Sequence, residues 1–415
     1  MRSLELGTRL EQDIYDDNDV LLLAAGARMT ARRLRKIRAR GLRTVTGRPP
    51  ARRKRKSRRA RPTPTPPESD AADVAAVHGI AQGVESPAIR QLDDVIEEGF
   101  ISEVPDPEQL SPAAPRLSLS NLREEADAAR DYLRIALDDY ANVATDLIEG
   151  RTTPQVGGHD LLRPMIHMIR QDRSLGMLVM NLRAPTEDFL FNHGLNTAIL
   201  SMTVAARLGY DDQQVLALGA AALFQDVGML RVPESIRLAP RKLTDQERLL
   251  IELHPVHTVN ALERTMAFEQ NSLLASYQAH ERCDGSGYPR RRTGMFIHPL
   301  AKIVGVVDTF AAVICSRPYR GPLTPYAGVE LLLGEAQAGH LDRKAVRALL
   351  DCTSLFPIGS RVRLSDGTIA RVLRSNGAKH TAPVVVPLNP DGTETDEELD
   401  LARTDSLRVA ASLDG

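Results

Sequence analysis

Histidine and aspartate residues recur near the ends of successive apolar segments in the second half of the chain. Five segments carry one each: His193, Asp226, His254, His280 and Asp308. Imidazole and carboxylate groups bind divalent transition metals, and a carboxylate can bridge two ions. A lone histidine or buried aspartate is usually structural, but five together indicate a site. The pattern predicts one or two divalent ions of the iron or manganese type.

A glycine-rich loop follows the fourth of these residues, in the stretch HERCDGSGYP (280–289). A tight turn accounts for its aspartate, glycines and proline. It does not account for the glutamate beside the histidine, or for the tyrosine between glycine and proline. We therefore expect the loop to form part of the site. The loop residues in question are Glu281, Asp284, Gly285, Gly287, Tyr288 and Pro289.

The segments that must position these residues have helical periodicity, which begins at 121–150 and recurs to about residue 352. The two ends of the chain differ. Residues 9–26 predict a hairpin, followed by a helix after Thr30 and a strand at 42–46. Near the other end, 361–373 predicts a hairpin, and another strand precedes the turn at 389–392.

We therefore predict a mainly α protein in four parts. They are a small α+β module at 1–47, a basic and then Pro-rich disordered linker at 48–118, a helical domain at 119–355, and a small β-rich module at 356–415.

Charge is distributed very unevenly along the chain. Residues 32–61 contain sixteen Lys or Arg and no acidic residue, although the whole chain has a net charge of -1. No apolar periodicity accompanies the densest basic run, so we expect a solvated linker there. We do not expect specific nucleic-acid binding, because no base-reading module accompanies the basic run.

Composition indicates a cytoplasmic protein. The three cysteines, Cys283, Cys315 and Cys352, are odd in number and lack metal-site spacing, which is typical of a reducing compartment. We find no apolar run near the roughly 18 residues of a membrane helix. The N-terminus lacks the apolar core of a signal peptide.

Several stretches, in order over about 185–352, resemble the motifs of HD-GYP domains. These are helical metal-dependent phosphohydrolases that typically cleave cyclic di-GMP. HERCDGSGYP resembles the second half of the H-H-E-x-x-D-G-x-G-Y-P signature, and FNHGLNTAIL resembles the opening histidine helix. LFQDVGMLRVP resembles the H-D-I-G-K-x-x-I-P segment, and VVDTFAAVICSRPYR the closing D-x-x-D-A…R-P-Y-R segment.

The resemblance implies roles for particular residues. It implies that the five residues named first are metal ligands and that Asp226 is the bridging, catalytic one. It also implies that Arg317 and Arg320 hold substrate phosphates, a role that suits guanidinium groups. The implied ligand is cyclic di-GMP or a related cyclic dinucleotide. The Gly-Tyr-Pro loop is further implied to contact signalling proteins.

The chain departs from the family pattern at positions that matter for chemistry. The histidine before the bridging aspartate is Gln225, the lysine is Met229, the first histidine of the pair is Ala279, and the second aspartate of D-x-x-D is Ala311. An amide is a poor ligand for a transition metal, and alanine offers none. Losing the lysine removes a cation that stabilises transition-state charge, typically worth on the order of 10²–10³ in rate.

Two functions remain open. One is a degenerate domain that senses a nucleotide or binds proteins, with hydrolysis lost or much reduced. The other is an active metal-dependent cyclic di-GMP phosphodiesterase. Ligand counting favours the first. Two nearby residues could compensate: Arg231 for the lysine and His257 as an extra ligand, although we expect Arg231 to face solvent and His257 to lie outside the ligand set.

Overall fold

The computed structural model describes most of the second half of the chain and parts of the first. The described residues are 13–15, 21–23, 46–48, 86–100, 102–110, 117–151, 159–176, 189–265, 267–315, 323–353, 355–356, 358–376, 379–404 and 406–413.

Two buried helices form the centre of the fold, α7 (Phe189–Arg207) and α8 (Asp212–Phe224). Asp211 begins α8 with a capping box, in which its side chain accepts from the Gln214 backbone N–H and Gln214 reaches back. Most residues of α7 and α8 are buried, which is expected for helices that are apolar on nearly every side. The prediction of a mainly α protein is confirmed.

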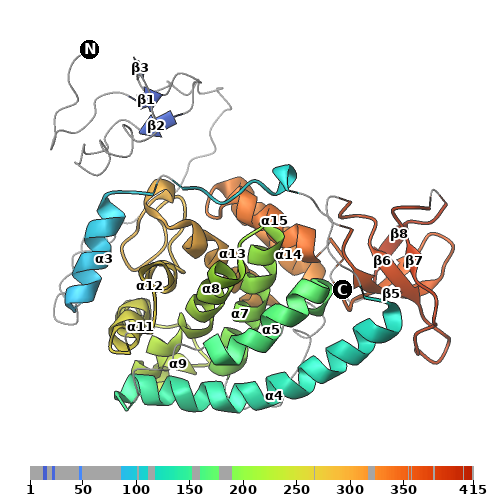
Figure 1. The fold of residues 1–415 in the computed structure, drawn as a ribbon, viewed down its shortest axis with the longest axis horizontal. Helices are drawn as coiled ribbons and strands as arrows, with labels where there is room; N and C mark the ends of the chain where they lie inside the picture. Colours follow the sequence, from blue (N-terminus) through green and yellow to red (C-terminus); the bar gives the residue numbers. More distant parts are fainter. Residues whose placement is uncertain are drawn as a thin grey trace.

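Further helices surround this pair (Figure 1). The long α4 (Leu119–Glu149) runs along one side of the bundle and ends at Gly150, whose φ of 74° is typical of a glycine C-cap. The remaining helices are α5 (His159–Gln171), η2 (Val227–Arg231), α9 (Glu234–Arg237), α10 (Asp245–Glu252), α11 (His254–Glu263), α12 (Gln270–Tyr277), η3 (Gly294–Phe296), α13 (Pro299–Ile314), α14 (Pro325–Ala338) and α15 (Arg343–Thr353).

The prediction of a disordered linker at 48–118 is wrong for part of that range. Residues Pro87–Glu97 form helix α3, which begins at Ser86, and a short 3-10 helix, η1, spans Pro107–Gln109. The apolar side of α3 packs on α11 and α12 in a second core. This core comprises Ile89, Leu92, Ile96, Leu253, Val256, Val259, Leu274 and Tyr277. Burial of these apolar side chains of α3 stabilises a helix in a stretch of sequence that is otherwise largely polar. Residues 51–85, with the densest basic run, lie outside the described residues.

Three short strands are described near the N-terminus: β1 (Asp13–Tyr15), β2 (Leu21–Leu23) and β3 (Thr46–Arg48). They pair antiparallel in the order β2-β1-β3. The predicted hairpin is confirmed. The predicted strand at 42–46 lies later along the chain, beginning at Thr46. The helix expected after Thr30 lies outside the described residues.

The C-terminal part is an antiparallel sheet of order β7-β6-β5-β4-β8. The predicted hairpin joins β4 (Arg361–Leu364) to β5 (Ile369–Arg374) through Gly367, whose φ is 90°. The predicted later strand is β6 (Val384–Pro387), whereas β7 (Leu399–Asp400) and β8 (Val409–Ser412) were not predicted. Several sheet residues share one core with the bundle helices: Val362, Leu364, Ala370, Val372, Leu373, Val385 and Leu401.

None of the described helices combines the length and hydrophobicity that crossing a membrane requires.

Candidate metal centre

Five separate elements deliver the five predicted ligand residues to one cavity of about 700 Å³. His193 lies in the first turns of α7, and Asp226 lies between α8 and η2. His254 is the first residue of α11, His280 lies in the turn after α12, and Asp308 lies in α13. All five side chains are largely buried, so they form the floor of the cavity.

These residues form two triads that share Asp226. In the first, Asp226 Oδ1 lies 3.1 Å from His254 Nε2 and 3.1 Å from His280 Nε2. In the second, the other carboxylate oxygen, Oδ2, lies 3.6 Å from His193 Nε2, which is 2.8 Å from Asp308 Oδ1. Asp226 therefore presents one oxygen to each triad, as a carboxylate that bridges two ions would.

The spacing of the first triad fits a metal ion. Two ligand atoms about 2.1 Å from an ion, at right angles to each other, would be separated by about 3.0 Å. His254 Nε2 and His280 Nε2 are 2.9 Å apart. Both nitrogens also face Asp226, so the three donors converge on one region. The ligand roles themselves stay a prediction.

Electrostatics at the site favour charged forms. Burial alone would raise the pKa of Asp226, but hydrogen bonds and charges from His254 and His280 outweigh it and hold that pKa well below its usual value. Asp308 behaves in the same way. Burial would raise its pKa, but hydrogen bonds and charges from His193 and His280 keep that pKa below its usual value. Burial would lower the pKa of His280, but its hydrogen bonds to Asp226 and Asp308 raise it to about 9.

The glycine-rich loop positions His280. The backbone N–H of Tyr288 donates to the His280 carbonyl at 3.2 Å. The Tyr288 ring stacks on the imidazole, with centroids 4.9 Å apart and an interplanar angle of 14°. Gly287 must lack a side chain, because a Cβ there would lie 2.4 Å from two backbone atoms, the Arg282 nitrogen and the His280 oxygen.

Glu281 fixes the backbone that follows the same loop. Its carboxylate accepts from the backbone N–H groups of Arg290 and Arg292, at 2.8 and 2.9 Å. Burial, opposed by these hydrogen bonds and by the charges of the two arginines, raises the pKa of Glu281 to about 7. The aspartate, Asp284, is exposed and accepts from the backbone N–H of Ser286, while Gly285 has a φ of 87° and Pro289 is buried. Five of the six predicted loop residues thus lie outside the cavity lining, and Tyr288 is the one of the six that lines the cavity.

The four departures from the family pattern occupy different environments. Gln225 is fully buried, and its Nε2 donates to Asp308 Oδ1 at 3.0 Å. Met229 lines the cavity. Ala279 is fully buried in the apolar core and is not among the residues that line the cavity, and Ala311 is also fully buried. Met229 is therefore the one of the four substitutions that lines the cavity, while Gln225 contacts the site through its hydrogen bond to Asp308.

Neither compensating residue faces the site. Arg231 donates to the Ile148 carbonyl at the end of α4, and with His257 it lines a different pocket. Arg317 and Arg320 lie outside the described residues. Cations that sequence reasoning missed line the cavity instead: Arg237, Arg241, Lys242 and Arg282. Three of them fall within residues 237–242, a basic cluster that could have drawn attention.

Comparisons with known proteins agree with this architecture. A family model described as an HD domain matches residues 177–345. The chain is 26% identical over 293 residues to "Cyclic di-GMP phosphodiesterase PA4108" of Pseudomonas aeruginosa, covering 70% of each protein. It is 33% identical over 255 residues to "3'3'-cGAMP-specific phosphodiesterase 1" of Vibrio cholerae, covering 51% of this chain and 58% of the relative.

Among solved structures, one similar chain is Bd1817, a HDG"Y"P protein from Bdellovibrio bacteriovorus. It has a TM-score of 0.41 and 16% identity, and the match covers 84% of this chain and 96% of that one. The HD-domain match at residues 177–345 and the phosphodiesterase relatives together support the resemblance of this part of the chain to HD-GYP domains.

Proposed function

We propose that this protein binds a cyclic dinucleotide, cyclic di-GMP or a close relative, above its metal centre. We further propose that it acts in signalling through that binding, or through protein partners, with hydrolysis lost or much reduced. Relatives named as cyclic di-GMP and cGAMP phosphodiesterases support the ligand class. The cavity of about 700 Å³, with a floor of metal donors and a rim of cations, suits a ligand that carries two phosphodiesters.

The observation that carries the loss of hydrolysis is the placement of Gln225. Its amide nitrogen donates a hydrogen bond to Asp308, so a hydrogen-bond donor faces a carboxylate that the second triad needs as a ligand. Imidazole would offer a nitrogen lone pair in that region, whereas the amide can offer only a neutral oxygen. The second triad is thereby left with three protein donors, one of them shared.

Met229 weakens the same site in another way. A divalent ion, when bound, would supply a Lewis acid for a phosphoryl oxygen and would lower the pKa of a water. The protein must add positive charge where the phosphate gains negative charge, and a thioether at Met229 adds none. Arg241, one of the cations that line the cavity, donates two hydrogen bonds of 2.7 Å to the Glu247 carboxylate.

The active phosphodiesterase remains the second candidate, and a specific observation favours it. Asp226 offers separate oxygens to two complete triads, which is an arrangement that two-metal hydrolysis uses.

Metal analysis combined with a turnover assay separates the two candidates. Purified full-length protein should contain fewer than two metal ions per chain, and it should bind cyclic di-GMP while hydrolysing it barely or not at all. Substituting Arg317 and Arg320 should weaken nucleotide binding without changing metal content. Rapid hydrolysis by the unmodified protein, abolished by Asp226→Ala, would establish the enzyme and overturn the proposal.

A further inference from the structure

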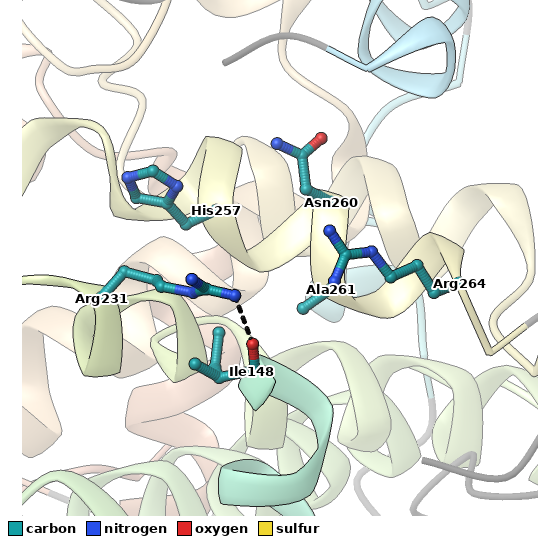
Figure 2. Close-up of a pocket in the computed structure, with 6 residues that line it drawn as sticks. All are labelled: Ile148, Arg231, His257, Asn260, Ala261 and Arg264. Carbon is teal, nitrogen blue, oxygen red and sulfur yellow. Dashed lines mark hydrogen bonds between the residues drawn. The ribbon is translucent and has the colours of Figure 1, made fainter. Parts of the chain in front are cut away.

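A second pocket, of about 300 Å³, lies between the end of α4, η2 and α11 (Figure 2). We call it the arginine pocket. Its lining residues are Ile148, Arg231, His257, Asn260, Ala261 and Arg264. His257 and Asn260 belong to α11, Arg264 is the residue that ends it, and Arg231 reaches toward this side of the helix from η2.

The charged groups of this pocket are all basic. Among the described residues, Arg231 and Arg264 form no ion pair, and no carboxylate lines the pocket. The acidic residues nearest in sequence are engaged elsewhere: Asp146 and Glu149 pair with Arg151, and Glu263 accepts from the Ser86 hydroxyl. Two guanidinium groups thus face one hollow without a counter-charge from the described chain.

The end of helix α4 accounts for only part of this arrangement. Arg231 donates to the Ile148 carbonyl, and an Nη of Arg264 lies near Gly150, where a Cβ would be 3.5 Å away. Cations at a helix C-terminus are stabilising. However, a guanidinium has five N–H donors, and the carbonyl of Ile148 uses one donor of Arg231. The remaining donors of both arginines, with the His257 ring, are left for an occupant.

We propose that the arginine pocket binds a phosphomonoester dianion. Two guanidinium forks match the geometry and charge of a phosphate group, which they can bind by paired hydrogen bonds. The volume lies at the small end of the range for ligand pockets, which suits a small phosphorylated molecule better than an extended polyanion. This site goes beyond the proposed function, because neither Arg231 nor Arg264 lines the metal cavity.

Calorimetric titration of the full-length protein tests the proposal, with inorganic phosphate in one arm and guanosine 5′-monophosphate in the other. Chloride should keep ionic strength constant. We expect one binding event per chain that weakens by ~10-fold or more in Arg264→Gln and in Arg231→Gln. Arg248→Gln, which alters an exposed arginine of α10 away from the pocket, should bind like the unmodified protein.

The two arms identify the source of the phosphate. Tighter binding of the nucleotide indicates a larger phosphomonoester, while equal binding indicates free phosphate, and both support the site. Absence of binding, or binding unchanged in Arg264→Gln, overturns it. Circular dichroism should check that each variant is folded. Because Arg264 is exposed, we expect Arg264→Gln to fold, and it keeps the test decisive if Arg231→Gln does not. An event that persists in both variants belongs to the metal centre, so the two proposals fail separately.

Discussion

Protonation of His280 determines how pH acts on the metal centre. Its pKa of about 9 means that the imidazole is protonated at neutral pH when no ion is bound, because Asp226 and Asp308 stabilise the charge against burial. A protonated imidazole cannot be a ligand, so the predicted ligand role of His280 requires metal binding to release that proton.

Apparent affinity for Mn²⁺ should therefore rise with pH, by about tenfold per unit between pH 6 and 9. Titrations at pH 6, 7 and 8, with proton release recorded in buffers of different ionisation enthalpy, measure this directly. His340→Gln, at a partly exposed histidine outside the site, should leave the slope unchanged. An affinity independent of pH would contradict the assignment of His280 as a ligand.

The residues at positions 225 and 229 should determine whether hydrolysis can be restored. Gln225→His and Met229→Lys together should raise metal content, and should raise kcat for cyclic di-GMP by on the order of 10²-fold, because one adds a ligand and the other a cation. Either change alone should do much less, since such groups act as a unit. A double variant without gain in metal or turnover would contradict the proposed cause of the loss.

Ala279→His makes a useful contrast. Ala279 is fully buried among the apolar side chains of the core. An imidazole has no room at this position without a shift of its neighbours. We expect this third reversion to lower the melting temperature rather than improve the site.

At the scale of elements, one ion pair fastens α3 to the glycine-rich loop. Arg290, directly after the loop, donates to Asp93 Oδ2 from Nε at 3.0 Å and from Nη2 at 2.7 Å. Its side chain is only 6% exposed. The first helix of the described residues is thereby joined to the segment that follows the loop positioning His280.

Arg290→Gln should lower the free energy of unfolding by about 1–3 kcal/mol, because it leaves Asp93 without its charged partner. Amide hydrogen exchange should accelerate first in α3. The neighbouring Arg292→Gln is the matched control: its contact with Glu97 is longer, at 3.6 Å, and the Glu97 side chain is exposed, so the pair should contribute less than about 1 kcal/mol. Equal effects of both variants would show that Arg290 is not a special anchor.

Sequence and structure agree best where several residues of one motif must meet. The five donor positions were identifiable because each stands in a recognisable segment, and the structure brings them together. Helix α3 was missed because its apolar stripe is short, with three buried residues, and it packs through contacts with α11 and α12 that local sequence does not reveal. The direction of Arg231 was open for a similar reason, since a short 3-10 turn can point neighbouring side chains to opposite sides.

At the scale of the whole molecule, the helical domain and the C-terminal sheet share a core and a buried arginine. Arg374 of β5 is 4% exposed, donates to the Leu117 carbonyl and lies 3.5 Å from Asp172, which precedes α7. The domain boundary predicted near residue 355 remains a prediction, but this contact joins the two sides of it.

Arg374→Ala should lower the free energy of unfolding by about 3–5 kcal/mol, because Asp172 would stay buried without a charged partner. Helix and sheet signals should disappear in one transition. Unfolding in urea is best monitored by far-ultraviolet circular dichroism, because the chain has no Trp to report by fluorescence. Arg403→Ala, at a position 83% exposed, should change little. Two separate transitions in the unmodified protein would contradict a shared core.

Gly228 leaves no space between η2 and α11: a Cβ there would lie 2.1 Å from the His254 carbonyl oxygen. Thr258 adds to the contact by accepting from the Gly228 N–H and donating to the Gln225 carbonyl. Met229 and Arg231, on the same turn of η2, line the metal cavity and the arginine pocket respectively. Occupancy of the two cavities therefore forms a thermodynamic cycle. By whatever factor phosphate changes the affinity for metal, the metal must change the affinity for phosphate equally.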